Sequence, residues 1–497
     1  MEIQFQTKTI PFCREIFRQT KVFQVSGESI VPDVNDDIGQ ILWSSAQLCL
    51  KSKDINTYGV SVTGCAEITV LYLNESREKI LPIRISKDFS VDFDVPGLEP
   101  DAKAHIRLTS MGVQARAVNS RKVAAQLTIR SELVCWEEDS LSFCAGVEDA
   151  AALALQTREI QTEILLPSQI CEKSFVISQQ IPLADEAEDA QILFSQIALA
   201  NQDCQMIGGK VLVKGTAEVS IVCVKDDASS LRTIEQSIPF TVLLDIAEES
   251  CEPEHILFET TAVYASLSDA INGSRVIELE IHALVQAGFE QRQTVSYLED
   301  LFSTRYPLAP QEESIRLTGA KEEQTIRASS EERLEWEGNV KEVISVFPQL
   351  LSFSVKEGRM AATAAVSVLA RGEDESLACG QKLLSFDFPL PEGDVELCFA
   401  ELLPVEARAG GNAVALSGTV AFKVRKTETR ELSCLVSAEL DQDAPYDLSR
   451  LPSLTAVVCR DGDLWSMAKA YHSSVSAIEE LRERYSTPAS VWLIPRI

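Results

Sequence analysis

The sequence predicts a mainly β protein, built of three repeated antiparallel β-sandwich-like modules and ending in a small βααβ domain. Apolar and polar residues alternate along many segments rich in Val, Ile and Thr, a period typical of half-buried strands. Several of these segments recur about 150 residues further along the chain, which indicates repeats of whole domains. After residue 453 the apolar residues change to helical spacing, which predicts the separate final domain.

The repeats are clearest in the first two thirds of the chain. The segment Gln40–Ser44 (QILWS) reappears as Gln191–Ser195 (QILFS), a shift of 151 residues. At the same shift Val60–Val70 falls on Val211–Ile221, and both segments alternate with the period of a strand. Repeats of this length are domains in their own right, and the chain of 497 residues has room for about three.

A third and more divergent copy begins near Met360. Its strand pattern matches that of the other two copies, and we expect Ala362 to stand where they carry Gly64 and Gly215. Glycine inside a strand often marks a close approach of another backbone or side chain.

Along the chain, strands carry the modules, and helices are expected only in connectors, at residues 148–166 and 296–303. The predicted division is module 1 at 1–133, a partly helical connector at 134–160, module 2 at 161–310, the divergent module 3 at 311–440, a linker at 441–452 and the final domain at 453–497.

The final domain combines two strands with two short helices. Starting at Leu464, apolar residues at i, i+3, i+4 and i+7 form one face of a helix, for which Asp461 and Asp463 are candidate caps. Ser474 is a candidate N-cap for a second helix, and Ser476 with Glu479 forms an alternative capping box. Acidic and basic residues balance here, so the net charge of −30 lies upstream.

The same residues resemble a LysM domain. A Gly-Asp turn, Leu-Trp, an alanine-rich helix ending in Tyr, and a terminal Ile-Pro stand in VVCRDGDLWSMAKAYHSSVSAIEEL and VWLIPRI. The loops that form the glycan-binding groove of LysM domains differ in this sequence, which favours a protein partner over peptidoglycan.

Upstream, VPDVNDDIGQIL (31–42), GCAEITVLYL (64–73) and DLFSTRYPL (300–308) resemble a domain of unknown function common in sporulating Clostridia. With a LysM-like domain at the end, nearly the whole chain resembles the SipL-type family of clostridial spore-coat morphogenetic proteins. The resemblance implies a non-enzymatic scaffold that reaches the forespore surface when its LysM-like domain binds the coat ATPase SpoIVA. Other coat proteins are further expected partners.

The candidate partner-binding residues lie at the start of the final domain. Packing in so small a core is the default role of Trp465, but aromatic anchors dominate protein interfaces, which also makes it a candidate for partner binding. The full candidate set is Asp461, Gly462, Asp463 and Trp465.

Composition limits the other classes of function. The net charge of −30 disfavours nucleic acid and anionic membranes as partners, and we expect no membrane insertion. The thirteen cysteines form no C-x-x-C pair and are expected to be free thiols, and the sequence shows no signal peptide. We therefore expect a protein of the mother-cell cytoplasm, located at the forespore surface and spore coat.

No catalytic, cofactor or metal motif stands out, since the four histidines have no ligand spacing and no nucleophile elbow occurs. We therefore expect no enzyme activity, cofactor or metal. The alternatives are a LysM protein that binds peptidoglycan or N-acetylglucosamine in the spore cortex or cell wall, and an enzyme with an unfamiliar acidic site.

Overall fold

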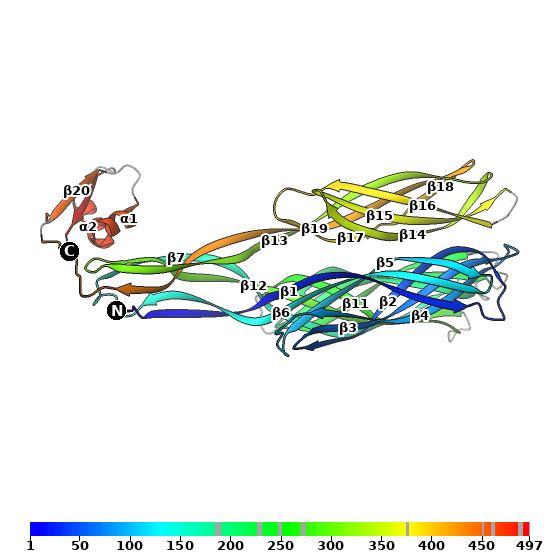
Figure 1. Ribbon diagram of the computed structural model, residues 1–497, viewed down its shortest axis with the longest axis horizontal. Helices are drawn as coiled ribbons and strands as arrows, with labels where there is room; N and C mark the ends of the chain where they lie inside the picture. Colours follow the sequence, from blue (N-terminus) through cyan, green and yellow to red (C-terminus); the bar gives the residue numbers. More distant parts are fainter. Residues whose placement is uncertain are drawn as a thin grey trace.

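The computed structural model describes residues 1–183, 190–225, 231–246, 251–269, 275–373, 377–449, 452–458, 463–485 and 491–496. The prediction of a mainly β, antiparallel protein is confirmed, because most of the described chain lies in antiparallel strands. The molecule is elongated, with a head at one end, a stalk in the middle and a small helical unit at the other end (Figure 1).

Three units, here called units 1 to 3, follow one another along the chain. Unit 1 contains β1 (Phe5–Ile30), β2 (Ile38–Asn56), β3 (Gly59–Asn74), β4 (Ile80–Asp94), β5 (Lys103–Asn119) and β6 (Lys122–Val147). Unit 2 contains β7 (Leu155–Pro182), β8 (Ala190–Met206), β9 (Lys210–Lys225), β10 (Leu231–Asp245), β11 (Cys251–Asp269) and β12 (Arg275–Ser303). Unit 3 contains β13 (Leu308–Glu335), β14 (Val340–Lys356), β15 (Arg359–Gly372), β16 (Leu377–Pro389), β17 (Val395–Leu402), β18 (Glu406–Gly410) and β19 (Ala413–Leu440).

Each unit has two sheets whose apolar faces meet. The sheets are β1-β6-β5 and β2-β3-β4 in unit 1, β11-β12-β7 and β10-β9-β8 in unit 2, and β13-β19-β17 and β14-β15-β16 in unit 3, where β18 also pairs with β19. Buried Val, Ile, Leu and Phe side chains from both sheets share one core in each unit. Burial of these apolar side chains is the main stabilising contribution to such a core.

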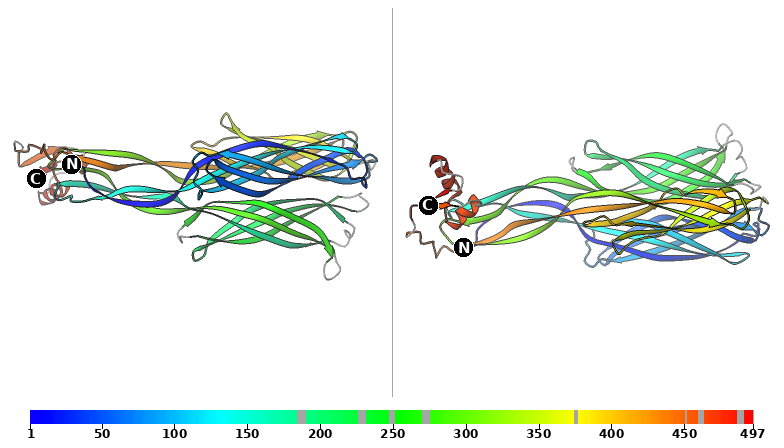
Figure 2. Two further views of the ribbon diagram at one scale, coloured as in Figure 1. Left: turned by 60° about the horizontal axis from the view of Figure 1, so that its bottom comes forward. Right: turned by 90° about the horizontal axis from the view of Figure 1, so that it is seen from above.

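The stalk is made of the outer halves of the six longest strands. β1 with β6, β7 with β12, and β13 with β19 leave the head as three two-stranded ribbons that lie side by side (Figures 1 and 2). A two-stranded ribbon alone is marginally stable in water. The three ribbons bury apolar residues against one another, among them Cys144 of β6, Leu298 of β12 and Leu435 of β19.

The three units also meet in the head, around three aromatic rings. The Trp43 ring lies 4.8 Å from that of Phe194, edge to face, and 4.8 Å from that of Phe347, stacked on it. These rings come from β2, β8 and β14, the equivalent strand of each unit. The head is therefore held together by a shared apolar core as well as by the chain connections.

The prediction of helices in the connectors is wrong. Residues 148–154 form turns, residues 155–166 belong to β7, and residues 296–303 belong to β12. The predicted connector at 134–160 is thus strand and turn. These Ala-, Leu- and Glu-rich segments have helical propensity, but pairing between β7 and β12 along the stalk outweighs it.

The prediction that Ala362 takes the place of the glycine in the third copy is also wrong. The strand registers place Gly64 opposite Phe89 and Gly215 opposite Phe240, and in unit 3 it is Ala364, not Ala362, that occupies this place.

The facing side chain explains the difference between glycine and alanine. A Cβ at Gly64 or Gly215 would lie 2.3 Å from the phenylalanine ring opposite. In unit 3 the residue opposite Ala364 is Leu384, which lacks a ring.

The C-terminal unit, residues 454–495, contains β20 (Leu454–Val458), α1 (Leu464–Ala470), α2 (Val475–Tyr485) and β21 (Val491–Pro495). Two predicted caps are confirmed. Asp463 accepts a hydrogen bond from the backbone N–H of Ser466, and the Ser474 hydroxyl accepts one from the backbone N–H of Ala477. Within the described ranges no helix has the length and apolar character needed to span a membrane.

Candidate partner-binding site at the end of the stalk

The C-terminal unit has a small apolar core that includes one residue of the stalk. Trp465 and Met467 of α1, Ile478 of α2 and Trp492 of β21 are buried together with Phe302 of β12. The ring of Phe302 lies 5.0 Å from that of Trp465, edge to face. The unit therefore completes its core by packing on the stalk.

Asp300 of β12 is the polar centre of this contact. Its carboxylate accepts a hydrogen bond of 2.7 Å from the indole Nε1 of Trp465. It also accepts hydrogen bonds of 2.7 and 2.8 Å from the Nζ of Lys469, one to each carboxylate oxygen. Charge-assisted bonds to a mostly buried carboxylate are among the stronger ones in proteins, so Asp300 fixes the orientation of α1.

Residues of β7 form the edge of the same contact. The guanidinium of Arg158 lies 5.5 Å from the ring centre of Trp465, and its Nη1 is 3.3 Å from Oδ2 of Asp463. The side-chain oxygen of Gln156 accepts a hydrogen bond from the backbone N–H of Val475, at the start of α2. Both helices are thus tied to the stalk through their first turns.

The linker also contacts the C-terminal unit. Tyr446 stacks on the ring of His472 at 3.8 Å, and Nη1 of Arg496 donates to the backbone oxygen of Leu448. Partial burial lowers the pKa of His472 below its ordinary value.

The candidate residues have different positions. Asp461 and Gly462 lie outside the described residues. Asp463 caps α1 and contacts Arg158, while Trp465 is buried between α1 and the stalk. Their role in partner binding stays a prediction.

Sequence reasoning missed the stalk side of this contact, formed by Gln156, Arg158, Asp300 and Phe302. A signal for two of these residues was available, because Asp300 and Phe302 belong to the motif DLFSTRYPL. The motif was recognised, but its contact with a segment more than 150 residues away could not be inferred from it.

One face of the C-terminal unit is apolar and open to solvent. The inner side chains of its two-stranded sheet pack on the helices, and the outer ones do not. Leu454 and Val458 are 45% and 74% exposed. We call this surface the outer sheet face; it consists of Leu454, Ala456, Val458, Val491, Leu493 and Pro495.

The cysteines that the structure describes elsewhere in the molecule show no sign of a reactive thiol. The twelve cysteines in the described part of the chain are free, and burial raises the pKa of Cys135 and Cys379 to about 12. Such thiols are poor nucleophiles because the thiolate is disfavoured. Over the same ranges no three His, Cys, Asp or Glu side chains are grouped so that they could hold a metal ion.

Comparison with protein families shows a similarity in unit 1. Residues 37–117 match the family model of the SipL SPOCS domain. The matched segment covers the residues from just before β2 nearly to the end of β5 in unit 1. No curated protein matches the chain. Through this part of unit 1 the chain is similar to SipL, which supports a SipL-type protein and suggests a role in sporulation.

Proposed function

We propose that this protein is a non-enzymatic scaffold of spore-coat morphogenesis. In this proposal units 1 to 3 are repeated sandwich-like modules, and the C-terminal unit is a LysM-like domain that binds a coat ATPase of the SpoIVA type. The protein is thereby recruited to the forespore surface. The SPOCS match in unit 1 supports the sporulation role, and the position of the C-terminal unit at one end of an elongated body supports its use in recruitment (Figure 1).

The observation that carries the proposal is the outer sheet face. Six neighbouring side chains on one face of β20 and β21 are apolar, and Leu454 and Val458 are largely exposed. Contiguous exposed apolar patches on a folded protein are typical of interaction sites, and the core of a protein interface is depleted in charge. A protein surface with apolar side chains therefore fits this face better than a sugar does.

The contacts with the stalk leave this face available. They come from α1, its cap and the first turn of α2, whereas the outer sheet face lies on the other side of the sheet from the helices. We propose that Trp465 supports binding by holding the unit in place on the stalk. We propose that Asp463 supports binding in the same way, through its contact with Arg158. Asp461 and Gly462 are proposed as partner-binding residues from the sequence alone.

Charge favours this end of the molecule for an encounter with a protein. Acidic and basic residues balance in the last 45 residues, so the excess of negative charge lies in the body. A strongly acidic body keeps the free protein dissolved, and a neutral end does not repel an acidic partner.

A single charge placed in the outer sheet face tests the proposal. Val458→Asp in the full-length chain is expected to weaken binding to the purified coat ATPase by about tenfold or more, because an unpaired carboxylate would be buried in the interface. Val436→Asp, at an exposed valine of β19 in the stalk, is the matched control and is expected to bind normally. Biolayer interferometry measures both affinities.

Unchanged ATPase binding by Val458→Asp would contradict the proposed surface. Binding of peptidoglycan fragments by the full-length chain, with no binding of the ATPase, would replace the scaffold proposal by the glycan-binding alternative.

A further inference from the structure

The three units differ at the end of their cores that faces the stalk. In each unit this end is bounded by the loop that joins the two sheets, between β4 and β5, β10 and β11, or β16 and β17. In unit 1 this loop has eight residues, 95–102, and in unit 3 it has five, 390–394.

Strand registers and hydrogen bonds align the two loops residue by residue. The backbone N–H of Val95 donates to the oxygen of Tyr58, and the N–H of Leu390 donates to the oxygen of Gly358. Tyr58 and Gly358 lie in the equivalent turns, between β2 and β3 and between β14 and β15. Val95 and Leu390 therefore occupy the same place, and the additional residues of unit 1 follow Val95.

Those additional residues close unit 1. Val95-Pro-Gly-Leu98 is a tight turn, with a hydrogen bond from the N–H of Leu98 to the oxygen of Val95 and a positive φ at Gly97. The turn directs Leu98 into the core, where it is buried with Ala102 and with Phe93 at the end of β4. We call Leu98 the plug of unit 1, because its side chain fills the end of the core that faces the stalk.

Unit 3 lacks this plug and has a pocket in its place. Phe388, the counterpart of Phe93 by register, is 37% exposed, whereas Phe93 is 1% exposed. Val355 nearby is 43% exposed. The pocket has a volume of about 400 Å³ and is lined by Arg130, Phe353, Ser354, Val355, Leu390, Val395, Glu396 and Leu397.

Unit 2 resembles unit 1 in this respect. Leu244 of β10, Ile246 directly after it and Cys251 at the start of β11 are all buried. Among the parts of the three units that the structure describes, the stalk-facing end is therefore open in unit 3 alone. Five residues separate β10 from β11, as many as separate β16 from β17, so the openness of unit 3 goes with its exposed Phe388 and not with loop length alone.

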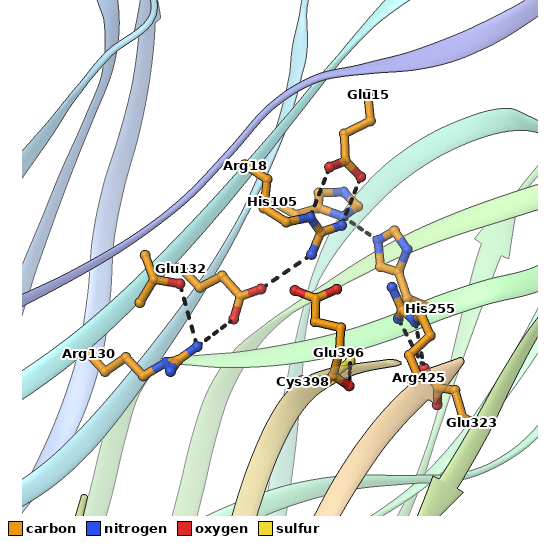
Figure 3. A network of polar contacts seen from close by, with 11 residues as sticks. Glu15, Arg18, His105, Arg130, Glu132, His255, Glu323, Glu396, Cys398 and Arg425 are labelled. Atoms are coloured by element: carbon orange, nitrogen blue, oxygen red, sulfur yellow. Dashed lines mark hydrogen bonds and ion pairs between the residues drawn. The ribbon is translucent and has the colours of Figure 1, made fainter. Parts of the chain in front are cut away.

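One wall of the pocket comes from unit 1. The guanidinium of Arg130 lies 4.6 Å from the ring centre of Phe353 and 3.5 Å from the carboxylate of Glu132. Figure 3 shows Arg130 and Glu132 facing Glu396 of β17. The pocket thus has an apolar floor with polar groups at its edge, an arrangement that suits a peptide with one buried apolar side chain and an exposed backbone.

We propose that this pocket, here called the unit 3 pocket, binds a peptide segment of a second protein partner by taking up a leucine-sized side chain. The occupant is inferred from unit 1, where a leucine on a tight turn fills the equivalent space. This site is distinct from the outer sheet face, and it lies at the head end of the stalk. One chain could then hold two different proteins at the two ends of its stalk.

The test uses the plug of unit 1 as the probe. A fluorescein-labelled peptide of residues 94–103, DVPGLEPDAK, is titrated with the full-length protein, and fluorescence anisotropy measures binding. Val355→Glu is expected to weaken binding by about tenfold or more, because it places a charge in the apolar pocket. Val176→Glu, at an exposed valine of β7 away from the pocket, is the matched control and is expected to bind like the wild type.

Two further arms keep the test independent of folding defects. The same peptide with Leu98→Ser is expected to lose binding to the wild-type protein. Replacing residues 390–394 with the longer loop of unit 1, VPGLEPDA, is expected to fill the pocket and abolish peptide binding while raising the unfolding midpoint.

Three results would overturn the proposal. The first is no peptide binding at about 1 mM protein, a concentration at which even weak peptide contacts are detected. The second is equal peptide binding by the wild type and Val355→Glu. The third is a concentration-dependent dimer that Val355→Glu abolishes, which would make a second copy of the chain the occupant. None of these results affects ATPase binding at the outer sheet face, so the two proposals fail separately.

Discussion

The head and the far end of the stalk show two ways of joining parts of a chain. In the head, Trp43, Phe194 and Phe347 come from three units and pack in one buried cluster. At the far end, the C-terminal unit meets the stalk through few residues, with Asp300 and Phe302 on the stalk side. The units of the head share this cluster in addition to their own cores, whereas the body contributes only Phe302 to the buried core of the C-terminal unit. We infer that it can detach without unfolding the body.

The largest expected effect is in the head. Trp43→Ala removes the ring that contacts both Phe194 and Phe347 and leaves a cavity where three units meet. We expect the free energy of unfolding to fall by about 3–5 kcal/mol, measured by urea denaturation. Trp43→Phe is the control and is expected to cost less than about 1.5 kcal/mol. It keeps a ring, and it removes an indole N–H that has no hydrogen-bond partner among the residues described.

The attachment at the far end is expected to be weaker. Asp300→Ala removes the acceptor for Trp465 and the ion-pair partner of Lys469, which should weaken docking by about 2–3 kcal/mol. Small-angle X-ray scattering should then show a displaced C-terminal unit, while the urea midpoint of the body stays unchanged. Asp300→Asn, which retains an acceptor oxygen, is expected to stay docked more often. A lowered midpoint of the body would contradict the idea of a merely attached unit.

A smaller effect tests the comparison between units 1 and 3. Gly64→Ala places a Cβ 2.3 Å from the ring of Phe89, and we expect a loss of about 1–3 kcal/mol. Adding Phe89→Leu recreates the pair Ala364 and Leu384 of unit 3 and should recover part of the loss. A double-mutant cycle measures this coupling, and strictly additive losses would contradict the explanation.

A further effect concerns pH at the contact of units 1 and 2, and it accumulates over several pH units. Burial raises the pKa of Glu259 to about 8, although its carboxyl accepts a hydrogen bond from the N–H of Leu108. The folded protein therefore keeps a proton that the unfolded chain releases near pH 4.5. The stabilisation is complete below that pH and is lost as pH rises toward 8, at about 1.4 kcal/mol per pH unit.

Glu259→Gln should remove this slope while keeping an acceptor for Leu108. The difference between the wild-type and Glu259→Gln urea midpoints, measured from pH 5 to pH 8.5, isolates this group from the many other carboxylates. A constant difference across that range would contradict the assignment.

Local patterns in the sequence predicted local structure well. Alternation of apolar and polar residues predicted the strands of the units. Asp463 and Ser474, predicted as N-caps, cap the two helices. Both signals depend on residues close together in sequence. The mainly β class could therefore be predicted from periodicity alone.

Long-range pairing set the limits of prediction. Residues 155–166 and 296–303 have helical composition, yet they pair with each other as the ribbon of the stalk. The residue of unit 3 that corresponds to Gly64 and Gly215 was predicted as Ala362, two residues before the correct Ala364. Only the strand register shows that Leu384 faces Ala364. Trp465 was recognised as important, but its partner Asp300 lies 165 residues earlier in the chain.

The most direct test of the central claim compares the full-length chain with a chain that ends after Ser449. We predict that the shortened chain loses binding to the purified coat ATPase and keeps the urea midpoint of the body, since the C-terminal unit is attached and carries the outer sheet face. Full ATPase binding by the shortened chain would contradict the claim that this unit recruits the protein.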